Sequence, residues 1–122
     1  MADVLFVAYP RCSTCKKAQK WLDEQGVEYR FRDIVQENPS TAELAAWLEG
    51  SDLAPRKLFN TSGKLYRERG LKAQLDAGMS TEDTLAMLGE EGMLVKRPLL
   101  VVDGTVRAAG FREPVWAEIV GL

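Results

Sequence analysis

Cys12-Ser13-Thr14-Cys15 decides the fold of this chain, because these residues lie between an apolar run and a helical pattern. The run before them, Asp3-Val4-Leu5-Phe6-Val7-Ala8-Tyr9, predicts a short strand. The run after them, residues 16–25, predicts a helix that begins at Ser13 or Thr14 and stops at Gly26. The two cysteines are three residues apart and therefore share one face of this helix. A C-x-x-C pair at such a strand-to-helix junction is typical of a redox site.

The position of each cysteine predicts its chemical role. Unpaired N–H groups and a partial positive charge at the start of a helix stabilise a thiolate. We therefore expect Cys12, at the helix mouth, to be the attacking thiolate and Cys15, one turn inside, to be the resolving thiol. The neighbouring Arg11, Ser13 and Thr14 are candidates for binding the substrate or thiol. Two other interpretations stay open: small core residues that happen to be cysteine, or metal ligands completed by a partner chain.

Composition and charge exclude several classes of protein. A chain of 122 residues fits one domain, residues 1–122, and a net charge of −2 gives no basic face for nucleic acid. No apolar run approaches the ~20 residues of a membrane span, and no signal peptide follows the start of the chain, so we expect a cytoplasmic protein without membrane contact. With no histidine and two cysteines, Cys-His catalysis and a Cys₂His₂ zinc site are excluded, and one chain alone cannot form a Cys₄ site.

Two strands and a helix are predicted to complete the two halves of a sheet domain. Residues 27–34 alternate in polarity and predict a strand that completes a β-α-β unit. Residues 99–102 and 105–109 predict a hairpin about Asp103-Gly104. Arg112-Glu113-Pro114 then opens a last helix, with Pro114 at its first position.

Helices are predicted between these two halves. The capping box Ser40-Thr41-Ala42-Glu43 begins a helix that runs to Gly50, a short helix covers residues 63–69, and a third begins at Ser80 and ends near Gly92. The order of elements predicts an α/β, thioredoxin-like fold, in which helices flank a small mixed sheet. Residues 39–93 form a helical insert between its βαβ and ββα halves.

Two further segments are candidates for the site. Lys96-Arg97-Pro98-Leu99 precedes the hairpin, and X-Pro bonds are where cis peptides occur. A cis-proline at this point of a thioredoxin-like fold faces the cysteine pair, so Arg97 is expected to reach an anion or thiolate near Cys12. The alternative is a plain edge-strand proline with a solvated arginine. The polar loop Asn60-Thr61-Ser62-Gly63-Lys64 is expected to cap a helix, or else to bind an anion through backbone N–H groups.

These motifs resemble the glutaredoxin-linked arsenate reductase and Spx-like family of thioredoxin-fold proteins over essentially the whole chain. The resemblance rests on Tyr9-Pro10-Arg11-Cys12-Ser13-Thr14-Cys15-Lys16-Lys17-Ala18, Asn60-Thr61-Ser62-Gly63-Lys64-Leu65-Tyr66 and Gly92-Met93-Leu94-Val95-Lys96-Arg97-Pro98-Leu99. It implies a nucleophile at Cys12, an oxyanion-binding arginine at Arg97, and a cis-proline at Pro98.

The chain departs from the arsenate reductases of this family at the positions that would bind arsenate. Ala8 stands where they have a histidine, and Asn60 where they have an arginine. A further arginine aligns near Gly110 or Phe111, with Arg112 as a loose substitute. Three guanidinium groups bind the oxyanion in those enzymes, so weak arsenate reduction is expected here. Cys15, which those reductases lack, is similar to a cysteine of Spx-like redox switches.

The leading prediction is a thiol–disulfide oxidoreductase in which Cys12 attacks and Cys15 resolves, leaving a reversible disulfide. Glutathione, glutaredoxin or thioredoxin would reduce that disulfide, and no metal or organic cofactor is expected. One alternative is an Spx-like redox-sensing transcriptional regulator that binds RNA polymerase through a surface around Gly50-Ser51-Asp52. Another is an arsenate reductase that uses Cys12 and Arg97.

Overall fold

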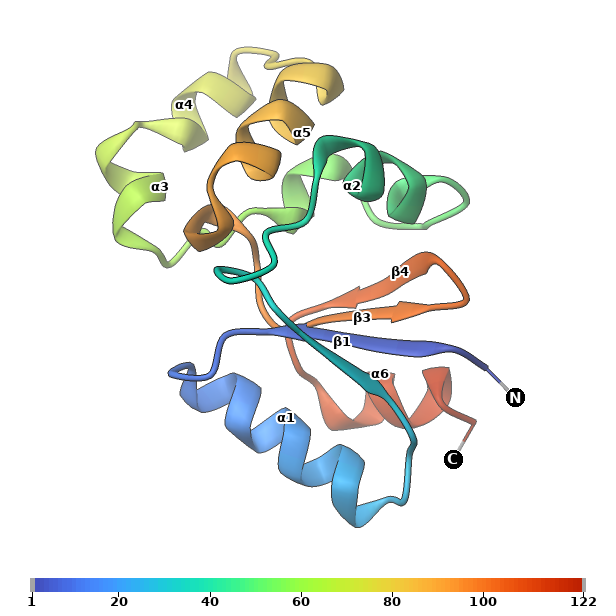
Figure 1. Ribbon diagram of the computed structural model, residues 1–122. Helices are drawn as coiled ribbons and strands as arrows, with labels where there is room; N and C mark the ends of the chain where they lie inside the picture. The colour runs from blue at the N-terminus through green and yellow to red at the C-terminus, as the bar shows by residue number, and fades with distance from the viewer. Residues whose placement is uncertain (1, 122) are drawn as a thin grey trace.

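The computed structural model describes residues 2–121 and contains a four-stranded mixed sheet with the order β2-β1-β3-β4 (Figure 1). Strand β1 (Val4–Ala8) pairs in parallel with β2 (Arg30–Asp33) and antiparallel with β3 (Leu99–Val102). Strand β3 continues into β4 (Thr105–Ala109) as an antiparallel hairpin. The predicted α/β class with a small mixed sheet is confirmed.

Helices cover both faces of this sheet. Helices α1 (Ser13–Glu24) and α6 (Glu113–Ile119) lie on one face, and the helices that connect β2 to β3 lie on the other (Figure 1). These connecting elements are α2 (Thr41–Leu48), a 3-10 helix (Pro55–Leu58), α3 (Lys64–Glu68), α4 (Leu71–Asp76), α5 (Thr81–Glu90) and a second 3-10 helix (Gly92–Leu94). Within residues 2–121, no helix has the length and apolar character needed to cross a membrane.

Strand β1 is buried on both faces, which explains its unbroken apolar sequence. Leu5 and Val7 point into the core beneath the connecting helices. Phe6 and Ala8 point into the second core, where Cys15 and Trp116 pack. The C-x-x-C helix is therefore fixed against the sheet by its own second cysteine.

The second strand is shorter than predicted. Residues 27–34 were expected to pair throughout, but β2 covers only Arg30–Asp33. The N–H of Val27 is used by the end of α1, where it donates to the carbonyl of Leu22 at 3.0 Å. The start of the alternating pattern therefore belongs to the helix terminus, and the prediction was wrong there.

Most predicted helix and turn boundaries are confirmed. Ser40 and Glu43 form the expected capping box, and the hairpin turns at Asp103 and Gly104, which have φ of 51° and 81°. These left-handed values are those of a two-residue type I′ turn. Two details differ: Pro114 is the second residue of α6 rather than the first, and helix α4 was not predicted.

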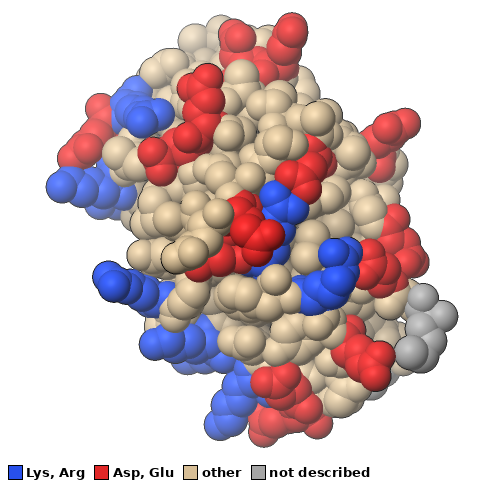
Figure 2. Space-filling view, viewed as in Figure 1, with Lys and Arg blue, Asp and Glu red and all other residues tan. Residues whose placement is uncertain are grey.

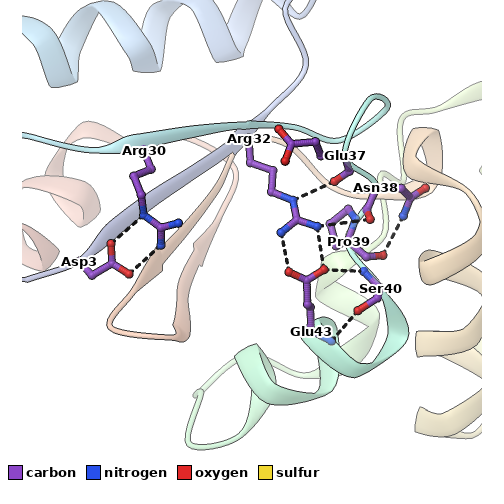
Figure 3. Close-up of polar contacts among 8 residues, drawn as sticks. All are labelled: Asp3, Arg30, Arg32, Glu37, Asn38, Pro39, Ser40 and Glu43. Atoms are coloured by element: carbon purple, nitrogen blue, oxygen red, sulfur yellow. Dashed lines mark hydrogen bonds and ion pairs between the residues drawn. The ribbon is translucent and has the colours of Figure 1, made fainter.

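A polar cluster attaches the edge strand β2 to the connecting helices (Figure 3). The guanidinium of Arg32 donates to both carboxylate oxygens of Glu43 and to the carbonyl of Glu37 at 2.9 Å. Hydrogen bonds from Arg32 and from the backbone of Ser40 lower the pKa of Glu43 to about 2. The Asn38 side chain extends the cluster to the carbonyl of Leu88 on α5 at 3.2 Å. One carboxylate thus caps α2 and ties it to the sheet.

Candidate functional site

Cys12 is placed at the mouth of α1 by the loop that leaves β1. Its N–H donates to the carbonyl of Tyr9 at 3.0 Å, and extended backbone angles (φ −83°, ψ 121°) make it the N-cap of α1. Its sulfur takes the place of the usual capping oxygen and accepts a hydrogen bond from the N–H of Cys15 at 3.2 Å. Cys12 is half-buried, and its sulfur therefore lies next to the backbone N–H groups of the first helical turn, which have no partner within the helix.

Cys15 lies one turn further on and faces the core. It is 3% exposed and packs with Ala18 and Leu22 on the inward face of α1. Burial, followed by the hydrogen bond with Cys12, raises the pKa of Cys15 to about 12, against smaller lowering effects of the Tyr9 backbone and the Arg97 charge. Both cysteines are free thiols in the structure, and Cys15 is protonated at neutral pH.

A pocket of about 590 Å³ lies in front of Cys12. Its walls come from four regions of the chain and are formed by Tyr9, Arg11, Cys12, Ser13, Thr14, Asn60, Ser62, Lys96, Arg97, Ala109, Gly110, Phe111 and Arg112. Every predicted site residue except Cys15 and Pro98 lines it. Both exceptions are buried behind its wall.

The pocket is strongly basic. Four of its lining side chains, Arg11, Lys96, Arg97 and Arg112, carry positive charge, and none of the described lining residues is acidic. Figure 2 shows Lys and Arg side chains gathered along the edge of the molecule where α1 begins. A pocket lined by charges of one sign attracts anions.

Arg97 lies on the pocket wall, preceding the predicted cis peptide bond to Pro98, which is confirmed. Its Nη1 donates to the carbonyls of Met93 at 2.9 Å and Val95 at 3.1 Å, and its guanidinium lies 5.6 Å from the centre of the Tyr9 ring. Among residues 2–121 these are its polar partners, and its expected contact with an anion or thiolate near Cys12 stays a prediction. The 3-10 helix before β3 holds the arginine in place and leaves Nε and Nη2 available to a ligand.

Asn60 is held at the pocket by a backbone hydrogen bond. The loop 60–64 was expected to cap a helix, and its Gly63 is the N-cap of α3, although no side chain caps that helix in the described structure. The N–H of Asn60 donates to the carbonyl of Leu94 at 2.7 Å. This bond, beside the bridge between Phe59 and Val95, places the loop next to the segment that carries Arg97.

Seven lining residues were not among the predicted site residues, although the last three had been noted after the hairpin: Tyr9, Ser62, Lys96, Ala109, Gly110, Phe111 and Arg112. Gly110 follows β4 with a φ of 90°, and a Cβ at this position would lie 3.2 Å from Cε of Lys96. The absence of a side chain there lets Lys96 lie across the end of the hairpin, along the pocket wall. The sequence shows Lys96 next to Arg97, but only its tertiary contact with Gly110 places it at the site.

The model of the ArsC family matches residues 7–119 of the chain. The chain is 46% identical to the uncharacterized protein YusI of Bacillus subtilis over 116 residues, which cover 95% of this chain and 97% of YusI. A crystal structure of an ArsC family related protein from Bacteroides fragilis superimposes with a TM-score of 0.88 at 45% identity, covering 96% of this chain and 97% of that one.

A more distant similarity connects the chain to regulators. It is 28% identical to the global transcriptional regulator Spx of Enterococcus faecalis over 104 residues, which cover 85% of this chain and 76% of Spx. Both branches of the resemblance inferred from the sequence motifs, the arsenate reductase branch and the Spx branch, are thus found among the similar proteins.

Proposed function

Because the chain belongs to the ArsC family, we propose that it is a thiol–disulfide oxidoreductase with Cys12 as nucleophile and Cys15 as resolving thiol. One observation carries this proposal above the others. The sulfur of Cys12 lies at a helix N-terminus in a basic pocket, hydrogen-bonded by the backbone of a second cysteine buried one turn behind it. Exposed nucleophile and protected partner are the arrangement that a two-step exchange requires.

The first step forms a mixed disulfide. The Cys12 thiolate attacks one sulfur of a substrate disulfide, the substrate S–S bond breaks, and the released thiolate takes a proton from water. In the second step Cys15 gives its proton to solvent and attacks the sulfur of Cys12, which releases the second substrate thiol. Two electrons pass from the cysteine pair to the substrate, and a dithiol or two glutathione molecules restore the pair.

The high pKa of Cys15 separates these two steps. While Cys15 is protonated it does not compete with Cys12 for the substrate, and it stays inside the core. When Cys12 is bound in the mixed disulfide, its hydrogen bond and charge no longer raise the pKa of Cys15, although burial still does. Because the chain has no histidine to act as base, we assign the removal of this proton to solvent.

The pocket suits a substrate or reductant that carries negative charge. We assign Arg97, Arg11 and Asn60 to binding, with Ser13 and Thr14 at the mouth of α1 and Pro98 supporting the wall behind. Glutathione, which carries carboxylates, and the protein thiols glutaredoxin and thioredoxin are the proposed reductants in a reducing cytoplasm. The cysteine chemistry requires no metal or organic cofactor.

Turnover of a small disulfide tests the proposal. Reduction of bis(2-hydroxyethyl) disulfide by glutathione is followed in the wild type, in Cys12→Ser and in Cys15→Ser. The proposal requires Cys12→Ser to be inactive in this assay, and it requires Cys15→Ser, mixed with the disulfide without added thiol, to stop at the mixed disulfide, detected as a mass increase on Cys12. Equal activity of Cys12→Ser and the wild type in every thiol-dependent assay would refute it.

The similarity to Spx supports a second candidate, a redox-sensing regulator. In this function the disulfide is a switch and RNA polymerase is the partner. The surface around Gly50-Ser51-Asp52 follows α2, where Gly50 and Asp52 are exposed and the Ser51 hydroxyl donates to the carbonyl of Val106 at 2.7 Å. A pull-down that recovers no polymerase subunit with either the oxidised or the reduced protein would count against this candidate.

Arsenate reduction through Cys12 and Arg97 is the third candidate. Ala8 is fully buried in the core, so no imidazole is available from that position. Arg112 lines the pocket, however, and could supply a further guanidinium beside Arg97. An arsenate reduction assay with glutathione and glutaredoxin, comparing the wild type with Arg97→Gln, decides whether this activity exists.

A further inference from the structure

A second cavity of about 530 Å³ adjoins the cysteine pocket. The two cavities share Lys96 and Ala109, so the side chain of Lys96 forms part of both. The second cavity is enclosed by the 3-10 helix Pro55–Leu58, the loop after it, α3 and α4. The two cavities therefore lie side by side, with Lys96 and Ala109 at their shared border.

The second cavity repeats the basic character of the first. Arg56, Lys57, Lys72 and Lys96 line it, and no acidic residue does among those described. Asp76, at its border, receives hydrogen bonds from Arg56 at 3.0 Å and from Lys72 at 2.9 Å. One carboxylate holds two cations in position, and the excess positive charge remains in the cavity.

Apart from Thr61, the remaining lining of the cavity is aromatic or aliphatic. Phe59 and Tyr66 are 1% and 7% exposed, with ring centroids 5.9 Å apart, and the half-buried Leu53 lies beside them. A cavity with a basic wall and an aromatic base accommodates a carboxylate and an apolar side chain together. That combination describes a peptide better than it describes an inorganic anion.

We propose that the two cavities form one groove that binds an acidic peptide segment of a protein substrate. The substrate cysteine lies at Cys12, and the chain next to it crosses Lys96 and places carboxylates against Arg56 and Lys57. This inference rests on the proposed oxidoreductase function, because it names the substrate class of the same site. A small disulfide needs only the first cavity, so the second gives selectivity for acidic protein substrates.

Binding of peptides that cannot undergo thiol exchange tests the groove. Labelled peptides about twelve residues long, enough to span both cavities, carry serine in place of cysteine and have acidic, neutral or basic flanks around one leucine. Fluorescence anisotropy compares them at about 50 mM and about 300 mM salt. We expect the acidic peptide to bind at least about tenfold more tightly than the neutral one at low salt, and this preference to shrink at high salt.

A pair of charge variants locates the binding. Arg56→Gln/Lys57→Gln changes the second cavity, and Lys20→Gln/Arg107→Gln removes the same charge from exposed positions outside both cavities. The first variant should weaken acidic-peptide binding at least about fivefold, and the control should leave it within about twofold. Equal binding of the acidic and neutral peptides by the wild type, or equal loss in both variants, would overturn the proposal. So would equally tight binding of a single-stranded oligonucleotide of the same charge.

A failure of the peptide groove can be distinguished from a failure of the proposed oxidoreductase function. Because the peptides contain no cysteine, binding does not depend on the reactivity of Cys12. Acidic-peptide binding by a protein without thiol-exchange activity would leave the groove in place and refute the oxidoreductase. Normal turnover of small disulfides without peptide binding would support the oxidoreductase function and refute the peptide groove.

Discussion

The backbone N–H of Cys15 donates a hydrogen bond to the sulfur of Cys12 over 3.2 Å. The residue proposed to resolve the mixed disulfide thus also positions the nucleophile, through its main chain rather than its thiol. The side chain of Cys15 meanwhile packs with Ala18 in the core. In the proposed mechanism, one residue therefore positions the nucleophile of the first step and is itself the nucleophile of the second.

The two thiols should differ sharply in their reaction with alkylating agents. Cys12 is half-buried at the pocket, whereas Cys15 is 3% exposed and its pKa is raised to about 12. Because only the thiolate reacts, iodoacetamide at pH 7 should modify Cys12 at least about 100-fold faster than Cys15. Peptide mass spectrometry over time measures both rates, with urea-unfolded protein as the control. Modification of Cys15 first would contradict the assignment.

Resolution of the mixed disulfide should accelerate with pH. The raised pKa of Cys15 means that its thiolate fraction, and hence the resolution rate, should rise about tenfold per pH unit between about pH 6 and 9. Reaction with dithionitrobenzoate in a stopped-flow instrument releases one thionitrobenzoate in the first step and a second one on resolution. Cys15→Ser should release only the first. A second phase whose rate does not change with pH would contradict this mechanism.

Glu43 should stabilise the fold at neutral pH and lose this effect in acid. The pKa of Glu43 is lowered from 4.5 to about 2, so its stabilisation is present above about pH 4.5 and is lost as the pH falls toward 2. Since this carboxylate is partly exposed, Glu43→Gln should cost only about 1 kcal/mol at pH 7. Urea unfolding at pH 7 and near pH 2 measures the difference. The control Glu49→Gln, at an exposed position, should have little effect at either pH.

A side chain at Gly92 should destabilise the fold. A Cβ there would lie 2.0 Å from the carbonyl oxygen of Ile34, and the same 3-10 helix supplies the Met93 carbonyl that holds Arg97. Gly92→Ala should therefore cost about 3 kcal/mol. Gly78→Ala is the comparison, because its Cβ would meet no atom within 4 Å and only its φ of 102° opposes the change. It should cost about 1 kcal/mol. Equal unfolding midpoints for the two variants would contradict the close-contact argument.

The sequence predicted elements whose signals are local. The capping box at Ser40, the Asp103-Gly104 turn and the C-x-x-C helix each depend on residues within one or two turns, and all three are found. It failed at Val27, whose alternating pattern could not reveal that its N–H is taken by the end of α1. It also missed α4, although the buried Leu71 and Leu75 have helical spacing, because Gly70 was taken as an end.

The sequence allowed individual site residues to be predicted, but it did not reveal the contacts between them. Cys12 and Arg97 were identified from their motifs, and the structure brings both to one pocket. The contact of Lys96 with Gly110, and the anchoring of Arg97 on the Met93 carbonyl, join segments whose pairing no local pattern encodes. Such long-range contacts determine which cations line the pocket and which are already bound.

The central claim is that Cys12 and Cys15 form a reversible redox couple, and a redox titration tests it most directly. The protein is equilibrated against glutathione or dithiothreitol buffers, alkylated, and analysed by mass. We expect the two thiols to be lost together, at a midpoint between about −180 and −280 mV, and this loss to be absent in Cys12→Ser. If no intramolecular disulfide forms anywhere in the titration, the pair is structural and the oxidoreductase account is wrong.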